Sequence, residues 1–532
     1  MPADSRSDSA FAPLREPLFR ALWIATVVSN VGTWMNDVSA AWLMTTLSAS
    51  PLVVAAVQAA TSVPMFVLAL PAGALADIVD RRRLLIVTQS WMLAVALVLA
   101  ETAHAALITP LRLLALASAL GVGAAMTAPA WQAITQELVS RESVTAAVTL
   151  NGVGVNIARA IGPAIGGAIV AASGPAAAFF LNALSFIGVI AVLTRWQRLP
   201  GEHALPPERF FGAIRSGFRY VRRAPAVQAA LVRGAAFTIC ASALWALLPV
   251  FVRVDLRGGP EHYGLLLGCL GVGAIVAALV MPAIRGRISV DRLIGSATLG
   301  FALAMGLAYA LRGLGTLAVA MTTCGACWML ALSTLNVAVQ TSVPAWVRAR
   351  ALGTYLLVFF GAMAFGSALW GAVATRVGTP TALAAAAGVL VLGFVATRRF
   401  EVTSGEGLDL APSIHWPAPA LVGAVEPDRG PVLVTVEYRI DPARTAEFAI
   451  VMDEIQRIRR RDGAFLWGLF VDTADPGRCI ESFLVDSWIE HLRQHARVTV
   501  ADRVTLDRAH QFQLRGEAPL VSHLVAVEGP TE

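Results

Sequence analysis

Apolar residues dominate the chain from about residue 18 to about residue 397, in runs that short polar connections separate. A helix needs about 20 residues to cross the roughly 30 Å hydrocarbon core of a bilayer, and each run has about that length. The pattern therefore predicts twelve membrane-spanning helices. Their expected ranges are 18–45, 51–76, 84–104, 107–129, 144–171, 175–194, 226–253, 260–283, 290–311, 314–340, 348–374 and 378–397.

The pattern changes after residue 400. Alternating strand-like segments and amphipathic helix-like segments follow a stretch rich in Pro, Gly and Ala, which is typical of a linker. The expected strands are 432–440, 465–472, 479–487 and 520–527, and the expected helices are 441–461 and 488–512. The order βαββαβ is the ferredoxin-like arrangement, so a small soluble α+β domain is expected here.

The chain is thus expected to divide into six parts. They are an N-terminal tail (1–17), a six-helix bundle (18–200), a central loop (201–225), a second six-helix bundle (226–400), a linker (401–428) and the α+β domain (429–532). The two bundles resemble each other at a constant offset of 204 residues. The matching pairs are Gln136 and Gln340, Gly162 and Gly366, Gly167 and Gly371, and Gly174 and Gly378. A parallel repeat of two six-helix halves produces such matches in transporters.

Composition agrees with a membrane protein, because 57% of the residues are hydrophobic and 14% are charged. The sequence contains no lysine, and its arginines gather in alternate connections, with Arg253 and Arg257 as the main exception. By the positive-inside rule both termini and the central loop of this multi-pass membrane protein are expected in the cytoplasm. Arginines placed between apolar runs do not indicate a nucleic-acid partner. A Walker motif is absent from the sequence, so direct drive by ATP is not expected.

Charge concentrates in one short stretch, GALADIVDRRRLLI, between the second and third expected helices. Gly73 permits close approach of a neighbouring helix, and Asp77 can meet an arginine or the positive N-terminus of a helix. Asp80, Arg81 and Arg82 follow at the membrane edge. For the arginines, simple obedience to the positive-inside rule explains their position equally well.

Gly73, Asp77 and Arg81 resemble the loop motif between helices 2 and 3 of the major facilitator superfamily, although Asp80 stands where many members have glycine. The stretches 29–42, 129–167 and 347–371 resemble the branch that contains the enterobactin exporter and the transmembrane secretion effectors. This resemblance implies an all-α fold of two six-helix halves that exports small molecules by alternating access. It also implies that Asp77 latches onto helix 11 in the outward-facing state.

Gly162, Pro163, Gly166 and Gly167 match the helix-5 motif of exporters in this superfamily. Proline removes one hydrogen bond of the helix and bends it, and the glycines let the helix lie tightly against its neighbours. A bend at the interface of the two halves would serve their rocking motion. The direction of transport follows from the resemblance alone.

Asp37 and Arg159 are ionisable residues inside expected helices 1 and 5. A lone charge there costs about 2.5 to 3.5 kcal/mol on insertion scales, so both should face the bundle interior or a water-filled cavity. One interpretation is a static ion pair that orients the helices. The preferred interpretation is that Asp37 carries the coupled proton, or engages substrate, while Arg159 modulates its pKa. Many proton antiporters of the superfamily carry an arginine in helix 4, where this chain has Ala117.

Amides and indoles inside apolar helices are candidate lining for a midplane cavity that binds an amphipathic molecule. Interhelical hydrogen bonds and core packing explain each of them equally well. The candidates are Trp34, Asn36, Gln58, Gln132, Gln136, Asn156, Trp245, Asn336 and Gln340.

The α+β domain resembles the dimeric folds of antibiotic-biosynthesis monooxygenases, but its sequence forms no recognisable catalytic constellation. Dimerisation or regulation is expected, then ligand sensing. His491 and His495 stand four apart, as metal ligands can, yet a third ligand is not evident and solvated histidines are favoured. We therefore expect no cofactor, no metal and no enzyme, with a small molecule and protons as partners. The alternative is a membrane-tethered enzyme or sensor that works through this domain.

Overall fold

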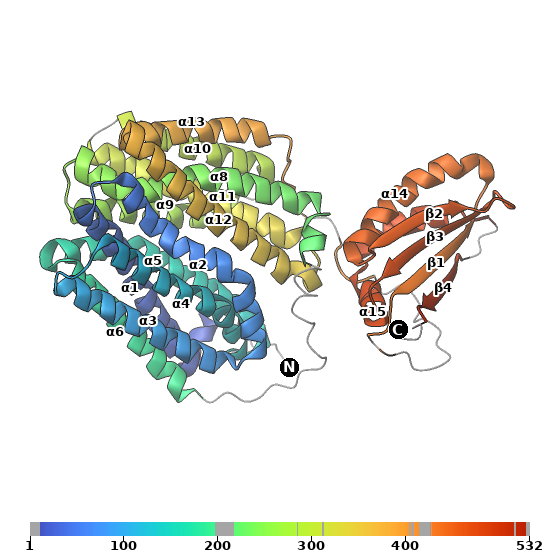
Figure 1. The fold of residues 1–532 in the computed structure, drawn as a ribbon, viewed down its shortest axis with the longest axis horizontal. Coiled ribbons are helices and arrows are strands. Elements are labelled where there is room, and N and C mark those ends of the chain that lie inside the picture. Colours follow the sequence, from blue (N-terminus) through green and yellow to red (C-terminus); the bar gives the residue numbers. More distant parts are fainter. Residues whose placement is uncertain are drawn as a thin grey trace, which may run out of the picture. The chain divides into compact units, whose positions relative to one another are not determined.

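The computed structural model describes residues 11–196, 217–284, 286–310, 313–403, 405, 409–413, 426, 428–514 and 518–527. Most of the expected tail, central loop and linker therefore lie outside the described residues. Within them, twelve helices of 19 to 33 residues precede a four-stranded sheet with its own helices (Figure 1).

The first six long helices follow the expected order. They are α1 (Pro17–Leu47), α2 (Pro51–Ile78), α3 (Arg81–His104), α4 (Pro110–Glu137), α5 (Val144–Ser173) and α6 (Pro175–Arg195). Four of them, α1, α2, α4 and α6, begin with proline, whose missing N–H costs nothing at the first helical position. The side chain of Asp80 accepts a hydrogen bond from the backbone N–H of Arg83 and so caps α3.

The second six long helices also follow the expected order. They are α8 (Pro225–Val250), α9 (Pro260–Ile284), α10 (Val290–Ala310), α11 (Leu314–Thr341), α12 (Ala345–Val377) and α13 (Thr379–Thr397), and the π-helical turn η3 (Phe251–Asp255) extends α8. Eleven of the twelve long helices are long and apolar enough to cross a membrane. The exception is α1, because Asn30, Asn36 and Asp37 lower its hydropathy. The chain is a multi-pass membrane protein.

Glycines of α5 bring this helix against two neighbours. A Cβ on Gly162 would lie 2.7 Å from Cβ of Trp34 in α1, and one on Gly167 would lie 2.5 Å from the carbonyl oxygen of Pro260 in α9. Such distances leave no room for a side chain, so glycine permits the approach. The helix α5 continues through Pro163, whose carbonyl oxygen lies 2.5 Å from the position of a Cβ on Gly264.

The glycines at the repeat positions of α12 make the corresponding contacts. A Cβ on Gly366 would lie 2.4 Å from the carbonyl oxygen of Ile239 in α8, and one on Gly371 would lie 3.0 Å from Cα of Leu52 in α2. The helix α5 thus packs on α1 and α9, and α12 packs on α8 and α2. Equivalent residues of the two halves make equivalent contacts at the offset of 204.

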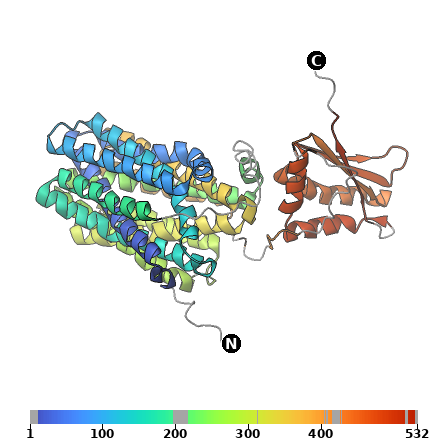
Figure 2. The same ribbon diagram turned by 90° about the horizontal axis from the view of Figure 1, so that it is seen from below.

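The C-terminal domain contains a sheet with the antiparallel strand order β2-β3-β1-β4 (Figure 1). Its elements are β1 (Val432–Arg439), α14 (Thr445–Asp462), β2 (Leu466–Val471), β3 (Arg478–Val485), α15 (Trp488–Arg497), α16 (Val500–His510) and β4 (Leu520–Val525). Alternate residues of β1 and β3 are buried, and Figure 2 shows the helices on one side of the sheet. The strand and helix order agrees with the sequence prediction except at one helix.

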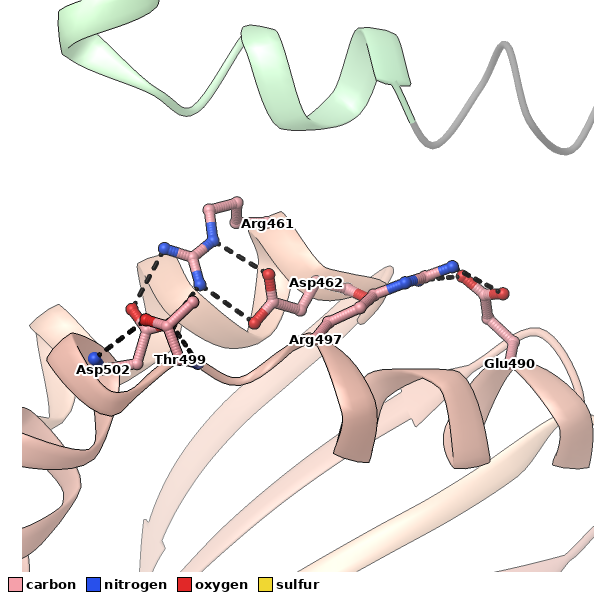
Figure 3. A network of polar contacts seen from close by, with 6 residues as sticks. All are labelled: Arg461, Asp462, Glu490, Arg497, Thr499 and Asp502. Atoms are coloured by element: carbon pink, nitrogen blue, oxygen red, sulfur yellow. Dashed lines mark hydrogen bonds and ion pairs between the residues drawn. The ribbon is translucent and has the colours of Figure 1, made fainter. Parts of the chain in front are cut away.

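The expected single helix 488–512 is wrong, because the chain breaks between α15 and α16. Thr499 and Asp502 form a capping box that starts a new helix, and Arg461 binds the carboxylates of both Asp462 and Asp502 (Figure 3). Arg497 donates to the backbone carbonyl oxygen of Asp462 at 2.8 Å. These charge-assisted bonds fix the end of α14 and the junction of α15 with α16.

Candidate functional site

A cavity of about 880 Å³ lies among the long helices. Residues of α1 to α6 line it from the first half, and residues of α8, α9, α11 and α12 line it from the second half. Pockets that enclose small molecules commonly have about 300 to 1,000 Å³. The cavity is therefore large enough for such a molecule and is shared by the two halves.

Eight of the candidates named from the sequence line this cavity. They are Trp34, Asn36, Asp37, Gln58, Asn156, Arg159, Trp245 and Asn336. Asp37 and Arg159 are the two charged residues of the lining, and both belong to the first half.

Two other candidates, Gln132 and Gln340, lie outside the lining, and a third, Gln136, has a side chain outside the described part of the structure. Gln132 and Gln136 follow Ala124, the last lining residue of α4, by 8 and 12 residues, which corresponds to about 12 and 18 Å of helix rise. Gln132 is exposed. Gln340 lies one helical turn beyond Asn336, so the amides of α4 and α11 extend past the end of the cavity.

The carboxylate of Asp37 accepts a hydrogen bond of 3.5 Å from the side-chain amide of Asn36. Among the ion pairs between described residues, none joins Asp37 to Arg159. The static pair considered from the sequence is therefore absent in this conformation. The side-chain carbonyl oxygen of Asn36 is buried and has no hydrogen-bond partner among the described residues, so it can accept from a bound molecule.

Arg159 lies against an aromatic ring instead. Its guanidinium carbon lies 5.8 Å from the ring centroid of Trp34, within the range of a cation–π interaction. This cation–π contact does not use the N–H groups of the guanidinium as hydrogen-bond donors, so these groups remain available to a ligand. An anionic or carbonyl group of a ligand can therefore bind Arg159.

The opposite side of the cavity is aromatic. The ring centroids of Trp245 and Trp328 are 4.2 Å apart, and Phe359 lies 6.0 Å from Trp328. The first half thus supplies the charges and most of the amides, while the second half supplies broad apolar faces. This division suits a molecule with a polar and an aromatic or apolar part.

Sequence reasoning missed two lining tyrosines, Tyr263 of α9 and Tyr355 of α12. The chain has only five tyrosines, and a phenol inside an apolar helix usually finds a polar partner. The rarity of tyrosine in the sequence could therefore have marked these two residues as candidates for the cavity lining. Tyr355 donates to the backbone carbonyl oxygen of Leu332 at 3.3 Å.

A further ionisable residue inside a span was also missed. Arg233 of α8 is buried, forms an ion pair with Asp291 at the start of α10, and lies 5.4 Å from the ring centroid of Phe394. Asp291 also accepts from the backbone N–H of Val402 at 3.3 Å. This pair lies outside the cavity lining and joins α8, α10 and the end of the bundle.

The loop between α2 and α3 makes contacts within the first half. Arg81 binds Glu137 of α4 at 2.7 Å and the carbonyl oxygen of Ala76 at 3.2 Å. Arg82 donates to the carbonyl oxygens of Leu193 and Thr194 at the end of α6. A cation at a helix C-terminus satisfies carbonyls that the helix leaves free. Both arginines therefore have specific structural partners, which the positive-inside rule alone does not explain.

Gly73 has no close helix neighbour among the described atoms in this conformation, so its expected role in close helix approach remains a prediction. A Cβ at this position would meet none of the described atoms within 4 Å. The side chain of Asp77 lies outside the described part, although its backbone belongs to α2. The proposed latch between Asp77 and the eleventh long helix is therefore not tested by this conformation.

Comparison with known proteins places the chain in a family. The family model described as "Transmembrane secretion effector" matches residues 8–531. The staphyloferrin A transporter of Staphylococcus aureus is 26% identical over 261 residues, which cover 48% of this chain and 64%, just under two thirds, of that protein. The enterobactin exporter EntS of Salmonella typhi is 27% identical over 301 residues, which cover 55% of this chain and 70% of that protein.

Solved structures show the fold. A mutant of the nucleoside transporter NupG has a TM-score of 0.60 at 15% identity, covering 72% of this chain and 99% of that one. A bacterial homologue of the lysosomal transporter Spinster, inward-facing and unoccupied, has a TM-score of 0.55 at 15% identity, covering 73% of this chain and 95% of that one. The chain therefore belongs to the transmembrane secretion effector family of major facilitator transporters.

Proposed function

We propose that this transporter is a proton-coupled exporter of small amphipathic molecules in the bacterial inner membrane, working by alternating access. The main support for this proposal is the cavity that the two halves share, which has Asp37 and Arg159 on one side and the aromatic rings of Trp245 and Trp328 on the other. Charged side chains inside membrane spans commonly mark ion or substrate pathways. Both termini and the C-terminal domain lie in the cytoplasm in this proposal, as the arginine distribution favours.

Siderophores are the substrate class that we favour, with other secondary metabolites and drugs as alternatives. Two relatives are named for siderophores, staphyloferrin A and enterobactin. The cavity has a matching chemistry, because Arg159 can bind an anionic or carbonyl group while the aromatic side binds apolar or ring surfaces.

Contacts between the two halves support a conformation that is open on the side of the α2–α3 loop. At the opposite end of the helices, Trp42 stacks on Tyr263 at 6.3 Å and Arg253 donates to the hydroxyl of Thr45 at 3.1 Å. A Cβ on Gly73, near the α2–α3 loop, would meet none of the described atoms within 4 Å. The transport cycle would be complete if the two halves closed together near Gly73 and Asp77 and moved apart at the opposite end of the helices.

Inverted membrane vesicles test the proposal. Export then becomes uptake into the vesicle, and we expect accumulation of enterobactin or staphyloferrin A that requires an acidic lumen. A protonophore should abolish the accumulation. Accumulation that persists with the protonophore would contradict proton coupling. Accumulation no higher than in vesicles that lack the transporter would show that these siderophores are not substrates.

The C-terminal domain offers a second, subordinate role in dimerisation. One sheet face carries exposed apolar side chains at both edges, and the cross-strand register puts these side chains of β2 and β4 on the same face, with β3 and β1 between them. They are Leu466 (52% exposed), Phe470 (58%), Leu520 (66%) and Leu524 (55%). We propose that a second copy of this domain covers that face.

The rival function assigns the work to the C-terminal domain as an enzyme or sensor. A deletion of residues 429–532 distinguishes the two. Transport in vesicles that survives the deletion supports the transporter as the working unit. Loss of a chemical turnover with transport unchanged would favour the rival.

A further inference from the structure

Three histidines of the C-terminal domain lie together. His491 and His495 are one helical turn apart on α15, and His523 comes from β4. One ring nitrogen from each lies within 4.8 Å of the others. The sequence offers only the first two as neighbours, because His523 follows 28 residues after His495.

The sheet register explains how His523 reaches the other two. His523 pairs with Val434 across β4 and β1, and opposite residues of neighbouring strands point to the same face. Val434 is buried under the helices, so His523 faces them as well. Its ring centroid lies 4.7 Å from that of His491 and 6.1 Å from that of Trp488.

We infer that His491, His495 and His523 form a binding site for a divalent transition-metal ion such as Zn²⁺. Imidazole nitrogen suits zinc and its first-row neighbours, and three protein ligands leave one position open for water or another molecule. The site lies in the C-terminal domain and is independent of the proposed transport cavity.

The distances fit such an ion. Zn–N bonds of 2.0 to 2.1 Å put two nitrogens of a tetrahedral site about 3.3 Å apart. The Nε2 atoms of His491 and His495 are 3.1 Å apart. A gap of up to 4.8 Å to the third nitrogen closes with about 1.5 Å of movement, and His495 and His523 are only partly buried.

Burial of His491 provides a second, independent observation. His491 is fully buried, and its Nδ1 has no hydrogen-bond partner among the described residues. The buried amide of Gln494 likewise lacks a partner there. A metal-bound histidine usually donates its other ring N–H to an acceptor, and the buried amide of Gln494, three residues after His491 on α15, is placed to supply one.

The surroundings of His491 disfavour its protonation. Burial is the largest cause that lowers its pKa, and the neighbouring His495, His523 and Arg459 act in the same direction. Arg459 is itself paired with Glu481 through bonds of 2.9 and 3.2 Å, which offsets its charge. Neutral imidazoles are the form that binds metal.

Zinc binding to the purified full chain tests the inference. The protein carries an affinity tag without histidine, is stripped with a chelator, and is titrated with ZnCl₂ by calorimetry, with bound zinc counted by elemental analysis. We expect one zinc per chain. Because a His491 variant risks misfolding, His495→Gln and His523→Gln are the variants, each expected to weaken binding at least about 100-fold. His510→Gln, an exposed histidine of the same domain, is the matched control and should bind as the wild type does.

A second variant separates the metal site from a mere hydrogen-bonded histidine pair. Gln494→Met removes the proposed acceptor and should weaken zinc binding about 10-fold. Co²⁺ in place of zinc should give visible absorption bands of a tetrahedral site in the wild type and lose them in His523→Gln. Wild-type protein that binds no zinc, or a folded His523→Gln variant that binds it unchanged, would overturn the inference.

Discussion

The guanidinium of Arg159 lies over the indole ring of Trp34, with 5.8 Å between the guanidinium carbon and the ring centroid. It does so although Asp37 lines the same cavity. The carboxylate of Asp37 instead accepts a hydrogen bond from Asn36. The two charges therefore have separate partners in this conformation, so each can act on a different species during transport.

Replacement of Asp37 tests its proposed role as the proton carrier. Asp37→Asn keeps the size and the hydrogen bond to Asn36 but cannot bind and release a proton, so transport should lose its dependence on the pH gradient. Asp37→Glu keeps the carboxylate and should retain gradient-driven transport at a reduced rate. Vesicle uptake measured at several pH gradients checks both. Wild-type rates with unchanged pH dependence in Asp37→Asn would contradict the role.

The ring of Trp34 is expected to hold the guanidinium of Arg159 in place for the substrate. Trp34→Ala removes a cation–π interaction of about 1 kcal/mol, so the KM for transport should rise about fivefold. Trp34→Phe keeps an aromatic face and should have a KM near the wild-type value. Equal KM values in the alanine variant and the wild type would show that the ring of Trp34 is not needed to position Arg159 for substrate binding.

Gly73 distinguishes a gate from a topological marker. A Cβ there meets no described atom within 4 Å, so Gly73→Ala should leave thermal stability within about 0.5 kcal/mol of the wild type. If the α2–α3 end closes by close helix approach, the same methyl group should hinder closure and lower the transport rate. Gly388→Ala on α13 also adds a methyl group in open space and is the control for both measurements. Full transport by Gly73→Ala would remove the close approach from the proposed cycle.

Helix positions in the membrane part were predictable because apolar run length dominates them. The expected range 314–340 became α11 (Leu314–Thr341), and 175–194 became α6 (Pro175–Arg195). The lining of the cavity was only partly predictable. Whether a buried amide lies within the cavity depends on its depth along the helix, and Gln132 and Gln340 lie too far along theirs.

The C-terminal domain shows where periodicity fails as a guide. The amphipathic pattern of 488–512 continues across the break between α15 and α16, because buried residues of both helices belong to the same hydrophobic core as the strands. The local signal was the sequence Thr499-Val-Ala-Asp502, which has the spacing of a capping box. Proximity of His523 to α15 had no local signal, since it depends on the pairing of β4 with β1.

The exposed apolar sheet face predicts a dimer. Phe470→Asp places a charge on that face and should convert a dimeric full-length protein in detergent to a monomer, as measured by light scattering after size exclusion. Ile450→Asp changes an apolar residue of similar exposure on α14 and should leave the dimer intact. A monomeric wild type, or a Phe470→Asp variant that remains dimeric, would contradict the proposal that a second copy of the domain covers this face.

The ion-pair network around Arg461 predicts how the C-terminal domain responds to acid. Burial opposes ionisation of Asp502, but Arg461 and the hydrogen bonds from Thr499 outweigh it, so the pKa of Asp502 is lower than usual. The unfolded state then binds more protons than the folded state below about pH 4, so this stabilisation is present at neutral pH and is lost as the pH falls through the folded pKa. Asp462, the other carboxylate on Arg461, has a raised pKa because burial outweighs its ion pair, so its protonation favours the folded state as the pH falls and opposes the effect of Asp502.

Asp502→Asn removes the charge and should destabilise α16 by about 1 to 3 kcal/mol at neutral pH. The difference from the wild type should shrink below about pH 4, where Asp502 itself becomes protonated. Hydrogen–deuterium exchange of peptides spanning 499–512, corrected for intrinsic rates at each pH, measures both effects in the full chain. Asp507→Asn alters an exposed carboxylate of the same helix and should change the opening free energy by less than about 0.5 kcal/mol. A difference between Asp502→Asn and the wild type that stays constant down to about pH 3 would show that Asp502 acts through its shape and hydrogen bonds rather than through its charge.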